Sequence, residues 1–118
     1  MAIYKRNNTE RKGKVTYNAG IVKGIVILAV EDVQGVAGNK EILNLTKVTF
    51  NNDDVVSIDI TVDVLYGYSV PDVAFDVQQC VRHNVESMSK YKVDKVDVHV
   101  NSVAFEEEHA YLITATLF

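Results

Sequence analysis

The stretch that most constrains the fold is VVSIDITVDVL, residues 55–65. Its apolar and polar side chains alternate, which is the pattern of a strand in a sheet with one covered face and one open face. The apolar set is Val56, Ile58, Ile60, Val62 and Val64, and the polar set is Ser57, Asp59, Thr61 and Asp63. The NNDD run at residues 51–54 predicts a turn, so residues 47–50 are expected to pair with this strand as a hairpin.

A helix is expected over residues 19–34, where the apolar positions fall at helical spacing. Asn18 precedes this segment as a cap, and Gly35 follows it as a stop signal. Gly20 and Gly24 lie four residues apart on this helix, and we expect them to let its backbone approach the sheet closely. No phosphate-binding glycine pattern accompanies them.

A second helix is expected over residues 71–90, with an apolar face formed by Val73, Ala74, Val77, Val81, Val85 and Met88. Short alternating segments at residues 14–17 and 92–105 predict two further strands, and residues 39–46 are expected to be a connection. The order is therefore β-α-β-β-α-β. It predicts an α+β fold, a two-layer sandwich in which a four-stranded sheet carries two helices on one face.

A chain of 118 residues is expected to form one domain with one core. We place the core of this single domain, residues 1–118, at residues 13–104 and a C-terminal extension at residues 105–118. Apolar residues make up 47% of the chain, which is ordinary for a globular protein. The chain should therefore fold without disulfides or metals.

The formal charge of −4 argues against a nucleic-acid or anionic-membrane surface, because both attract basic proteins. The single cysteine cannot form an internal disulfide, which fits a reducing cytoplasm. The longest apolar run, residues 25–30, is far shorter than the roughly 18 residues that a membrane span needs. No apolar region of a signal peptide follows the basic N-terminal stretch. We expect a cytoplasmic protein that neither binds nucleic acid nor inserts into a membrane.

Cys80 is the first candidate for chemistry, because His83 follows it within one turn of the second expected helix. Asp76 and Ser87 share the same flank, so the four side chains are the best case for a nucleophile with its base. Two turns, about 10 Å along the axis, separate Asp76 from His83, which is too far for the acid to orient the imidazole. No helix N-terminus lowers the pKa of a mid-helix Cys80. We expect no catalytic residue here, only a boundary cysteine beside a solvated histidine.

The polar face of the expected sheet is the second candidate. If residues 55–65 and 92–105 are neighbouring strands, their spacing permits three carboxylates and one imidazole to converge but does not require it. Such groups are suitable ligands for a divalent metal. The set is Asp59, Asp63, Asp97 and His99. Such residues also occur on any solvated sheet face, and no cysteine or second histidine strengthens the set. We expect no metal site and no cofactor site.

Five short segments follow one another in the second half of the chain: YG at 66–67, a Val-Pro-Asp-Val helix start at 70–73, Val-Gln-Gln at 77–79, Val-Glu-Ser-Met at 85–88 and KVDKVDVHVNSV at 92–103. This order resembles the carboxyl half of the alkaline shock protein family of Gram-positive bacteria. The first expected helix leads into EDVQGVAG at residues 31–38, which is similar to the amino half of that family. The resemblance covers residues 13–104 and contains no rare motif.

The resemblance implies a non-enzymatic cytoplasmic protein linked to the envelope stress response or to fatty-acid and lipid metabolism. It implies protein partners and self-association, and in some members attachment to the membrane through a partner. The family has no catalytic or cofactor motif, so no site residue is carried over. The leading hypothesis is a scaffold or regulatory protein. The alternative is a small RNA-binding or ligand-binding α+β module. An RNA-binding module of this type calls for a Gly-x-x-Gly loop or exposed aromatic residues on the sheet, together with a basic surface.

The last stretch, EEEHAYLITATLF at residues 106–118, departs from the family pattern. Residues 111–118 are apolar and β-prone, and leaving them in water would invite strand pairing. We expect them to add an extra strand to an open sheet edge, in the same chain or on a neighbouring subunit, with residues 106–108 as the connection. Pairing between subunits would give a symmetric dimer or a longer assembly. We expect an oligomer to which this segment contributes.

Overall fold

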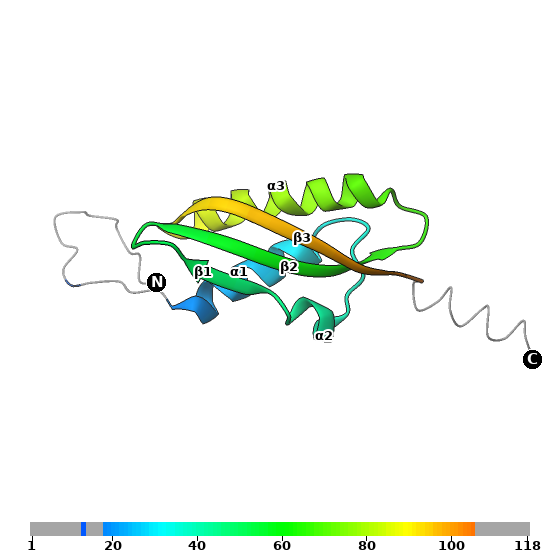
Figure 1. Cartoon of the computed structure of the whole chain (residues 1–118), viewed down its shortest axis with the longest axis horizontal. Coiled ribbons are helices and arrows are strands. Elements are labelled where there is room, and N and C mark those ends of the chain that lie inside the picture. Colours follow the sequence, from blue (N-terminus) through cyan, green and yellow to red (C-terminus); the bar gives the residue numbers. More distant parts are fainter. Residues whose placement is uncertain (1–12, 14–17, 106–118) are drawn as a thin grey trace, which may run out of the picture.

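The structure, a computed structural model, describes residue 13 and residues 18–105. Its elements follow one another as α1, α2, β1, β2, α3 and β3 (Figure 1). Their bounds are Ala19–Glu31 for α1, Lys40–Leu43 for α2, Lys47–Phe50 for β1, Val55–Leu65 for β2, Val70–Met88 for α3 and Lys92–Ala104 for β3. The strand expected at residues 14–17 and the segment 111–118 lie outside the described residues, and the expectations for them stay predictions.

The sheet has the strand order β1-β2-β3, so the described residues supply three strands where four were expected. β1 and β2 are antiparallel, as the hairpin pattern predicts. β2 and β3 are parallel along their length, from Val55 opposite Lys92 to Leu65 opposite Ala104. α3 is the crossover that joins these parallel neighbours.

Both long helices lie on one face of the sheet, and the other face is open (Figure 1). The predicted apolar sets of β2 and α3 meet in the core between the two layers. The fully or almost fully buried members are Val56, Ile58, Ile60, Val62, Val64, Val73, Val77, Val81 and Val85. Each such side chain contributes about 1.5–3 kcal/mol by leaving water. Met88 is exposed, contrary to the prediction, because α3 ends there and the chain turns away toward β3.

α1 begins after Asn18, as predicted, but ends at Glu31, three residues before the expected end. The Asn18 side-chain oxygen accepts a hydrogen bond from the Ile21 N–H at 3.0 Å, which satisfies one of the free donors of the first turn. Beyond the helix, Gly35 takes a φ of +100°, a conformation that glycine adopts without strain. Neither α1 nor any other helix in the described part of the chain is long and apolar enough to cross a membrane.

Gly20 and Gly24 do not face the sheet, so the expectation that they bring α1 close to it is wrong. Both glycines are exposed, and a methyl group added at Gly24 would meet no atom within 4 Å. The α1 side chains that pack into the core are instead Val22, Val26, Ala29 and Val30. The two glycines therefore belong to the outward face of α1.

The connection expected at residues 39–46 contains the short helix α2, which the sequence pattern did not predict. Asn39 caps it, because its side-chain oxygen accepts from the Glu41 N–H at 3.1 Å. Thr46 is buried just after the helix, and its hydroxyl donates to the Leu43 carbonyl at 2.7 Å. These hydrogen bonds fix the shape of the connection from within, and the buried Leu43 packs it into the core.

The segment between α1 and α2 completes the edge of β2 that β1 leaves open. β1 has four residues and β2 has eleven, so the C-terminal half of β2 needs other partners. The Ala37 N–H donates to the Asp63 carbonyl at 2.8 Å, and the Leu65 N–H donates to the Gly35 carbonyl at 2.7 Å. This edge of the sheet is therefore closed by a loop.

Candidate functional site

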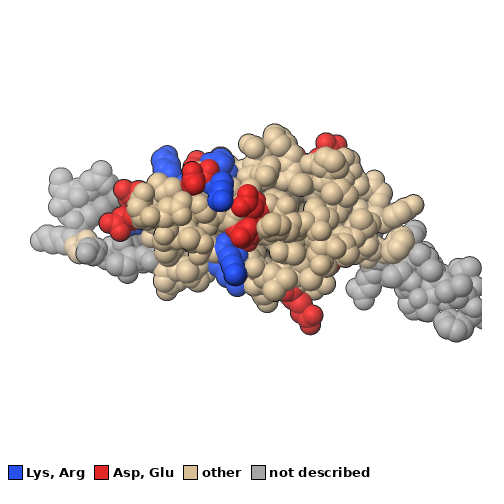
Figure 2. All heavy atoms as spheres, in the orientation of Figure 1, with Lys and Arg blue, Asp and Glu red and all other residues tan. Residues whose placement is uncertain are grey.

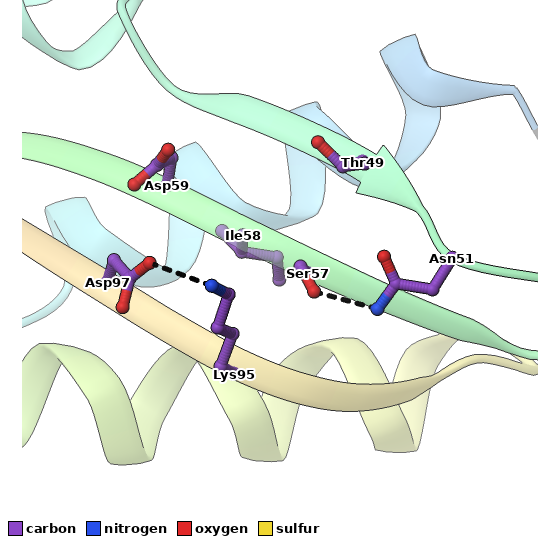
Figure 3. A pocket seen from close by; sticks show the side chains of 7 residues that line it. All are labelled: Thr49, Asn51, Ser57, Ile58, Asp59, Lys95 and Asp97. Carbon is purple, nitrogen blue, oxygen red and sulfur yellow. Dashed lines mark hydrogen bonds and ion pairs between the residues drawn. The ribbon is translucent and has the colours of Figure 1, made fainter.

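A shallow polar hollow lies on the open face of the sheet (Figure 3). Its volume is about 260 Å³, and side chains of all three strands and of the β1–β2 turn line it. The lining residues are Thr49, Asn51, Ser57, Ile58, Asp59, Lys95 and Asp97. The strand alternation puts these polar groups on the open face, because the apolar side chains of β2 point to the helices.

The polar groups in and beside this hollow mostly pair with one another. The Asn51 amide donates to the Ser57 hydroxyl at 2.8 Å. Lys95 Nζ lies 3.7 Å from Asp97 Oδ2, and both side chains are exposed. Ion pairs in this setting contribute about 0–1 kcal/mol, since water competes for both charges. The hollow therefore offers a solvated, internally paired surface.

Two of the four candidate metal ligands come together as predicted. His99 Nε2 lies 3.0 Å from Asp59 Oδ1, and Asp97 lines the same hollow. Asp63 does not join them, so the convergence of all four that the spacing permits does not occur. Across the described residues there is no group of three or more His, Cys, Asp or Glu side chains placed to hold a metal ion.

Asp63 is withdrawn from the open face and is only 5% exposed. One of its oxygens accepts from Asn101 Nδ2 at 3.0 Å and from Ser102 Oγ at 2.9 Å, and the other accepts from Asn39 Nδ2 at 3.4 Å. The cause is a shift in the β2–β3 register next to Asp63. Val62 lies opposite Val100 and Asp63 lies opposite Ser102, so Asn101 has no residue of β2 opposite it in the register. This carboxylate therefore joins β2, β3 and the α1–α2 connection.

Cys80 faces α1 and not the side chains that were considered as its catalytic partners. Its Sγ donates to the Ala29 carbonyl at 3.5 Å, and the side chain is half-buried. Burial raises the pKa of the Cys80 thiol, and the nearby Asp32 carboxylate raises it further. His83 and Asp76 are exposed on the same flank, and the Ser87 hydroxyl donates to the His83 carbonyl at 2.7 Å. The flank exists as predicted, but its thiol is disfavoured as a thiolate.

We expect iodoacetamide to alkylate Cys80 no faster than a small reference thiol near pH 7. The physical reason is the raised pKa of Cys80, since the thiolate is the reacting form and a higher pKa reduces its fraction at a given pH. Removing the Asp32 charge with Asp32→Asn should lower that pKa and speed the reaction modestly. A Cys80 that reacts much faster than the reference thiol would contradict this prediction, and mass spectrometry of quenched samples gives the rate.

Three α3 side chains that the sequence analysis did not single out bind the backbone of β3. Arg82 Nη1 donates to the Val93 carbonyl, and Glu86 Oε2 accepts from the Val93 N–H at 2.9 Å. Gln78 Nε2 donates to the Val96 carbonyl at 3.0 Å. The available signal was their spacing of four residues, which puts all three on one flank of a helix.

The sequence GVAG at residues 35–38 forms a Gly-x-x-Gly loop between α1 and α2. This is the loop that the RNA-binding alternative calls for, and the sequence analysis did not locate it. RNA-binding modules use such loops to hold nucleotide backbones. Here the Gly35 carbonyl accepts from the Leu65 N–H, so the loop backbone serves the sheet edge. Lys40, the adjacent cation, pairs with Glu31 at 2.7 Å. The loop therefore gives little support to the RNA-binding alternative.

Two bacterial proteins are similar to this chain in sequence. The uncharacterised protein YqhY of Bacillus subtilis is 27% identical over 107 residues, which covers 80% of this chain and 79% of that protein. The uncharacterised protein Spy1535 of Streptococcus pyogenes is 26% identical over 95 residues, 74% of this chain and 74% of that protein. Both matches extend over most of the relative's length.

Solved structures of the MamM CTD are similar in fold. One variant aligns with a TM-score of 0.51 and 18% identity, covering 70% of this chain and 93% of that chain. A variant in its nickel form also aligns with a TM-score of 0.51 and 18% identity, covering 70% of this chain and 96% of that chain. At this identity the likeness concerns the fold alone.

The family comparison covers the largest part of the chain. Residues 7–105 match the alkaline shock protein 23 family, which is described as having a cell envelope-related function. The match includes all the segments on which the resemblance was based, from EDVQGVAG at residues 31–38 to KVDKVDVHVNSV at residues 92–103. The resemblance is thereby confirmed, and the chain belongs to the alkaline shock protein 23 family.

Proposed function

We propose that this chain is a non-enzymatic scaffold or regulatory protein that serves the cell envelope by binding other proteins, first of all further copies of itself. Family membership supports the link to the envelope. The raised pKa of Cys80 supports the absence of nucleophilic catalysis. The observation that carries the proposal is the outward face of α1.

α1 is apolar almost all the way round. Its sequence AGIVKGIVILAVE has Lys23 as its only charged residue before the terminal Glu31. A helix of this kind is ordinarily covered on all sides, whereas a helix at a free surface carries polar residues on its outer face. α1 therefore has the composition of a helix that is buried by a partner.

The exposed residues of α1 form a continuous stripe. Ile21 is 47% exposed and Leu28 is 64% exposed, and Gly20 and Gly24 are exposed beside them. At about 100° per residue, Ile21, Gly24 and Leu28 fall within one side of the helix. A continuous apolar stripe that is exposed to water is typical of a protein-binding surface.

A second α1 helix fits this stripe. The glycines let another backbone approach closely, while Ile21 and Leu28 supply apolar contact on either side. Lys23 is turned toward its own chain, because its Nζ donates to the Asn44 carbonyl at 2.8 Å. A two-fold pairing of identical helices therefore brings no like charges together at the centre of the interface. We place this assembly in the cytoplasm, held at the membrane through a partner protein.

We expect Leu28→Glu to dissociate the assembly, because it puts one buried carboxylate from each copy into an apolar contact. Static light scattering at micromolar concentration measures this: the wild-type chain should have at least twice the monomer mass and the variant the monomer mass. The matched control is Phe75→Glu on α3, where the phenylalanine is 58% exposed, and the assembly should persist. A monomeric wild-type chain, or an unchanged mass for Leu28→Glu, would refute the proposal.

A further inference from the structure

Three side chains of α3 cover the outer edge of β3 near the start of the strand. α3 runs beside β3, and no strand of the described residues pairs with this outer edge (Figure 1). Arg82 Nη1 donates to the Val93 carbonyl, and Glu86 Oε2 accepts from the Val93 N–H at 2.9 Å. Gln78 Nε2 donates to the Val96 carbonyl at 3.0 Å. These three side chains form the α3 clamp.

The α3 clamp uses the backbone groups that a further strand would use. In an antiparallel pair, the residue opposite Val93 accepts from its N–H and donates to its carbonyl. Glu86 and Arg82 make the same two bonds with side chains, and their own charged groups lie 4.0 Å apart. An unpaired edge strand is a template for pairing with another chain, and covering it removes that template. The clamp therefore closes this part of the edge.

The segment under the clamp is complementary to itself. Residues 92–97 have the sequence Lys-Val-Asp-Lys-Val-Asp. In an antiparallel pairing of this segment with a second copy, Lys92 lies opposite Asp97, Val93 opposite Val96 and Asp94 opposite Lys95. Opposite charges placed directly across a strand pair stabilise it. Figure 2 shows acidic and basic side chains close together over the half of this face where β3 begins. These charges favour pairing between copies instead of preventing it.

The backbone of the segment fits the same pairing. Val56 lies opposite Val93 and Ser57 lies opposite Lys95, so Asp94 is an additional residue in the β2–β3 register. The bonds to the clamp show that the Val93 and Val96 carbonyls both point to the outer edge. Val93 of one copy lies opposite Val96 of the other, so outward backbone groups meet outward backbone groups. Both copies carry the same additional residue, and a two-fold axis keeps them in step.

We propose that the α3 clamp is an autoinhibitory contact over a self-pairing strand edge, and that the partner it excludes is a second copy of this chain. With the clamp in place, the edge at Val93 and Val96 is bonded within the chain. Without it, residues 92–97 of two copies pair as antiparallel strands about a two-fold axis, and the two sheets join into one. No residue of the α1 stripe takes part in this contact.

The double variant Arg82→Ala with Glu86→Ala tests the proposal. We expect static light scattering at micromolar concentration to give about twice the mass of the wild-type chain, since a two-fold contact adds one copy. The reference is the wild-type mass at the same concentration, whatever that mass is, so the result does not depend on the α1 interface. A double variant that keeps an intact fold and the wild-type mass would overturn the proposal.

Two controls separate loss of the clamp from loss of stability. Arg82→Lys with Glu86→Gln keeps a donor and an acceptor at Val93, and this variant should keep the wild-type mass. Asp63→Ala removes buried hydrogen bonds near the other end of β3 and leaves the clamp in place, so it should also keep the wild-type mass. A rise in mass for Asp63→Ala equal to that of the double variant would overturn the proposal.

Charge reversal tests the register between the copies. Asp94→Lys, added to the double variant, puts two basic side chains opposite each other and should return the mass to that of the wild type. Adding Lys95→Asp as well restores opposite charges across the pair and should restore the higher mass. Equal masses for these two sets of substitutions would overturn the proposed pairing.

Hydrogen exchange followed by NMR locates the contact. In a dilute sample of the double variant, the Val93 amide should exchange about tenfold or more faster than in the wild-type chain, because its acceptor is gone. At higher concentration it should slow again as the mass rises, because the second copy bonds it. The Ile60 amide, in the central strand, should stay slow and report an intact fold. A rise in mass with Val93 still fast would overturn the proposal.

A failure of the α1 interface has a different signature. Leu28→Glu, added to the double variant, should leave the mass at about twice that of Leu28→Glu alone, because the edge contact does not involve α1. Loss of the doubling in this background would show that the association depends on α1 and would overturn the proposal.

Discussion

Replacing Gly35 with alanine should lower the free energy of unfolding by about 3 kcal/mol, the largest effect that we expect from a single methyl group in this chain. Gly35 has a φ of +100°, which costs an L-residue about 1 kcal/mol or more. A Cβ there would lie 2.7 Å from Val73 Cγ2 and 3.0 Å from Tyr68 Cγ. Val73 is buried in the core and cannot move aside freely, so overpacking adds about 1–3 kcal/mol.

Gly67→Ala is the matched control for this substitution. Gly67 has a φ of +97°, almost that of Gly35, but a Cβ there would meet no atom within 4 Å. Its variant should therefore lose only the conformational contribution, about 1 kcal/mol. The difference between the two variants isolates the close contact of the α1–α2 connection with α3.

Urea unfolding of both variants measures the loss in the free energy of unfolding. In a separate thermal melt, the melting temperature of Gly35→Ala should fall by about 10 °C. The comparison is valid if the free energy of unfolding falls with urea concentration at the same slope in both variants, because that slope reports the surface exposed on unfolding. A Gly35→Ala chain as stable as Gly67→Ala would show that the packing of Val73 and Tyr68 yields easily. The close contact of Gly35 with α3 would then contribute little to the stability of the fold.

The elements that could be predicted from sequence are those whose signals are local. The alternation of β2 and the valines of α3 identify the core-facing side chains, because burial follows directly from period and hydrophobicity. The NNDD run places the hairpin turn, and Asn51 N–H donates to the Val55 carbonyl at 2.8 Å there. Each of these features depends on residues close together in the chain.

The features that could not be predicted depend on register between distant segments. A shift of one residue turns a side chain to the other face, and the irregularity at Asn101 leaves no mark in the sequence. The same holds for the pairing of Ala37 with Asp63 across the edge of β2. The period indicates which face of an element is apolar, but it does not indicate which backbone partner each residue finds.

The candidate site shows both outcomes on one strand. Asp59 and Asp63 have the same place in the alternation and were expected to share one polar surface. Asp59 stays exposed and reaches His99, as predicted. Asp63 is covered, because the α1–α2 connection brings Asn39 over it and the β3 irregularity brings Asn101. Only tertiary neighbours distinguish the two carboxylates.

Replacing Asp63 with alanine should lower the free energy of unfolding by about 2 kcal/mol. Hydrogen bonds to an ionised acceptor contribute about 1.5–3 kcal/mol, and Asp63 accepts from Asn101 and Ser102 through one oxygen. The residues from 18 to 105 leave no buried side-chain nitrogen or oxygen without a hydrogen-bond partner, so the variant creates a defect that the native chain does not have. Asp59→Ala is the matched control, and its exposed pair with His99 should contribute about 0.5 kcal/mol or less.

Asp63→Asn separates the charge of this carboxylate from its shape. The amide oxygen can occupy the position that accepts from Asn101 and Ser102, so the variant should lose less than half of what Asp63→Ala loses. A double-mutant cycle of Asp63→Ala with Asn101→Ala should give a coupling of about 1 kcal/mol if the contact holds β2 to β3. Zero coupling, or equal costs for Asp63→Ala and Asp59→Ala in urea unfolding, would contradict this assignment. The buried carboxylate would then be a by-product of the β3 irregularity, and the parallel ladder alone would hold the two strands together.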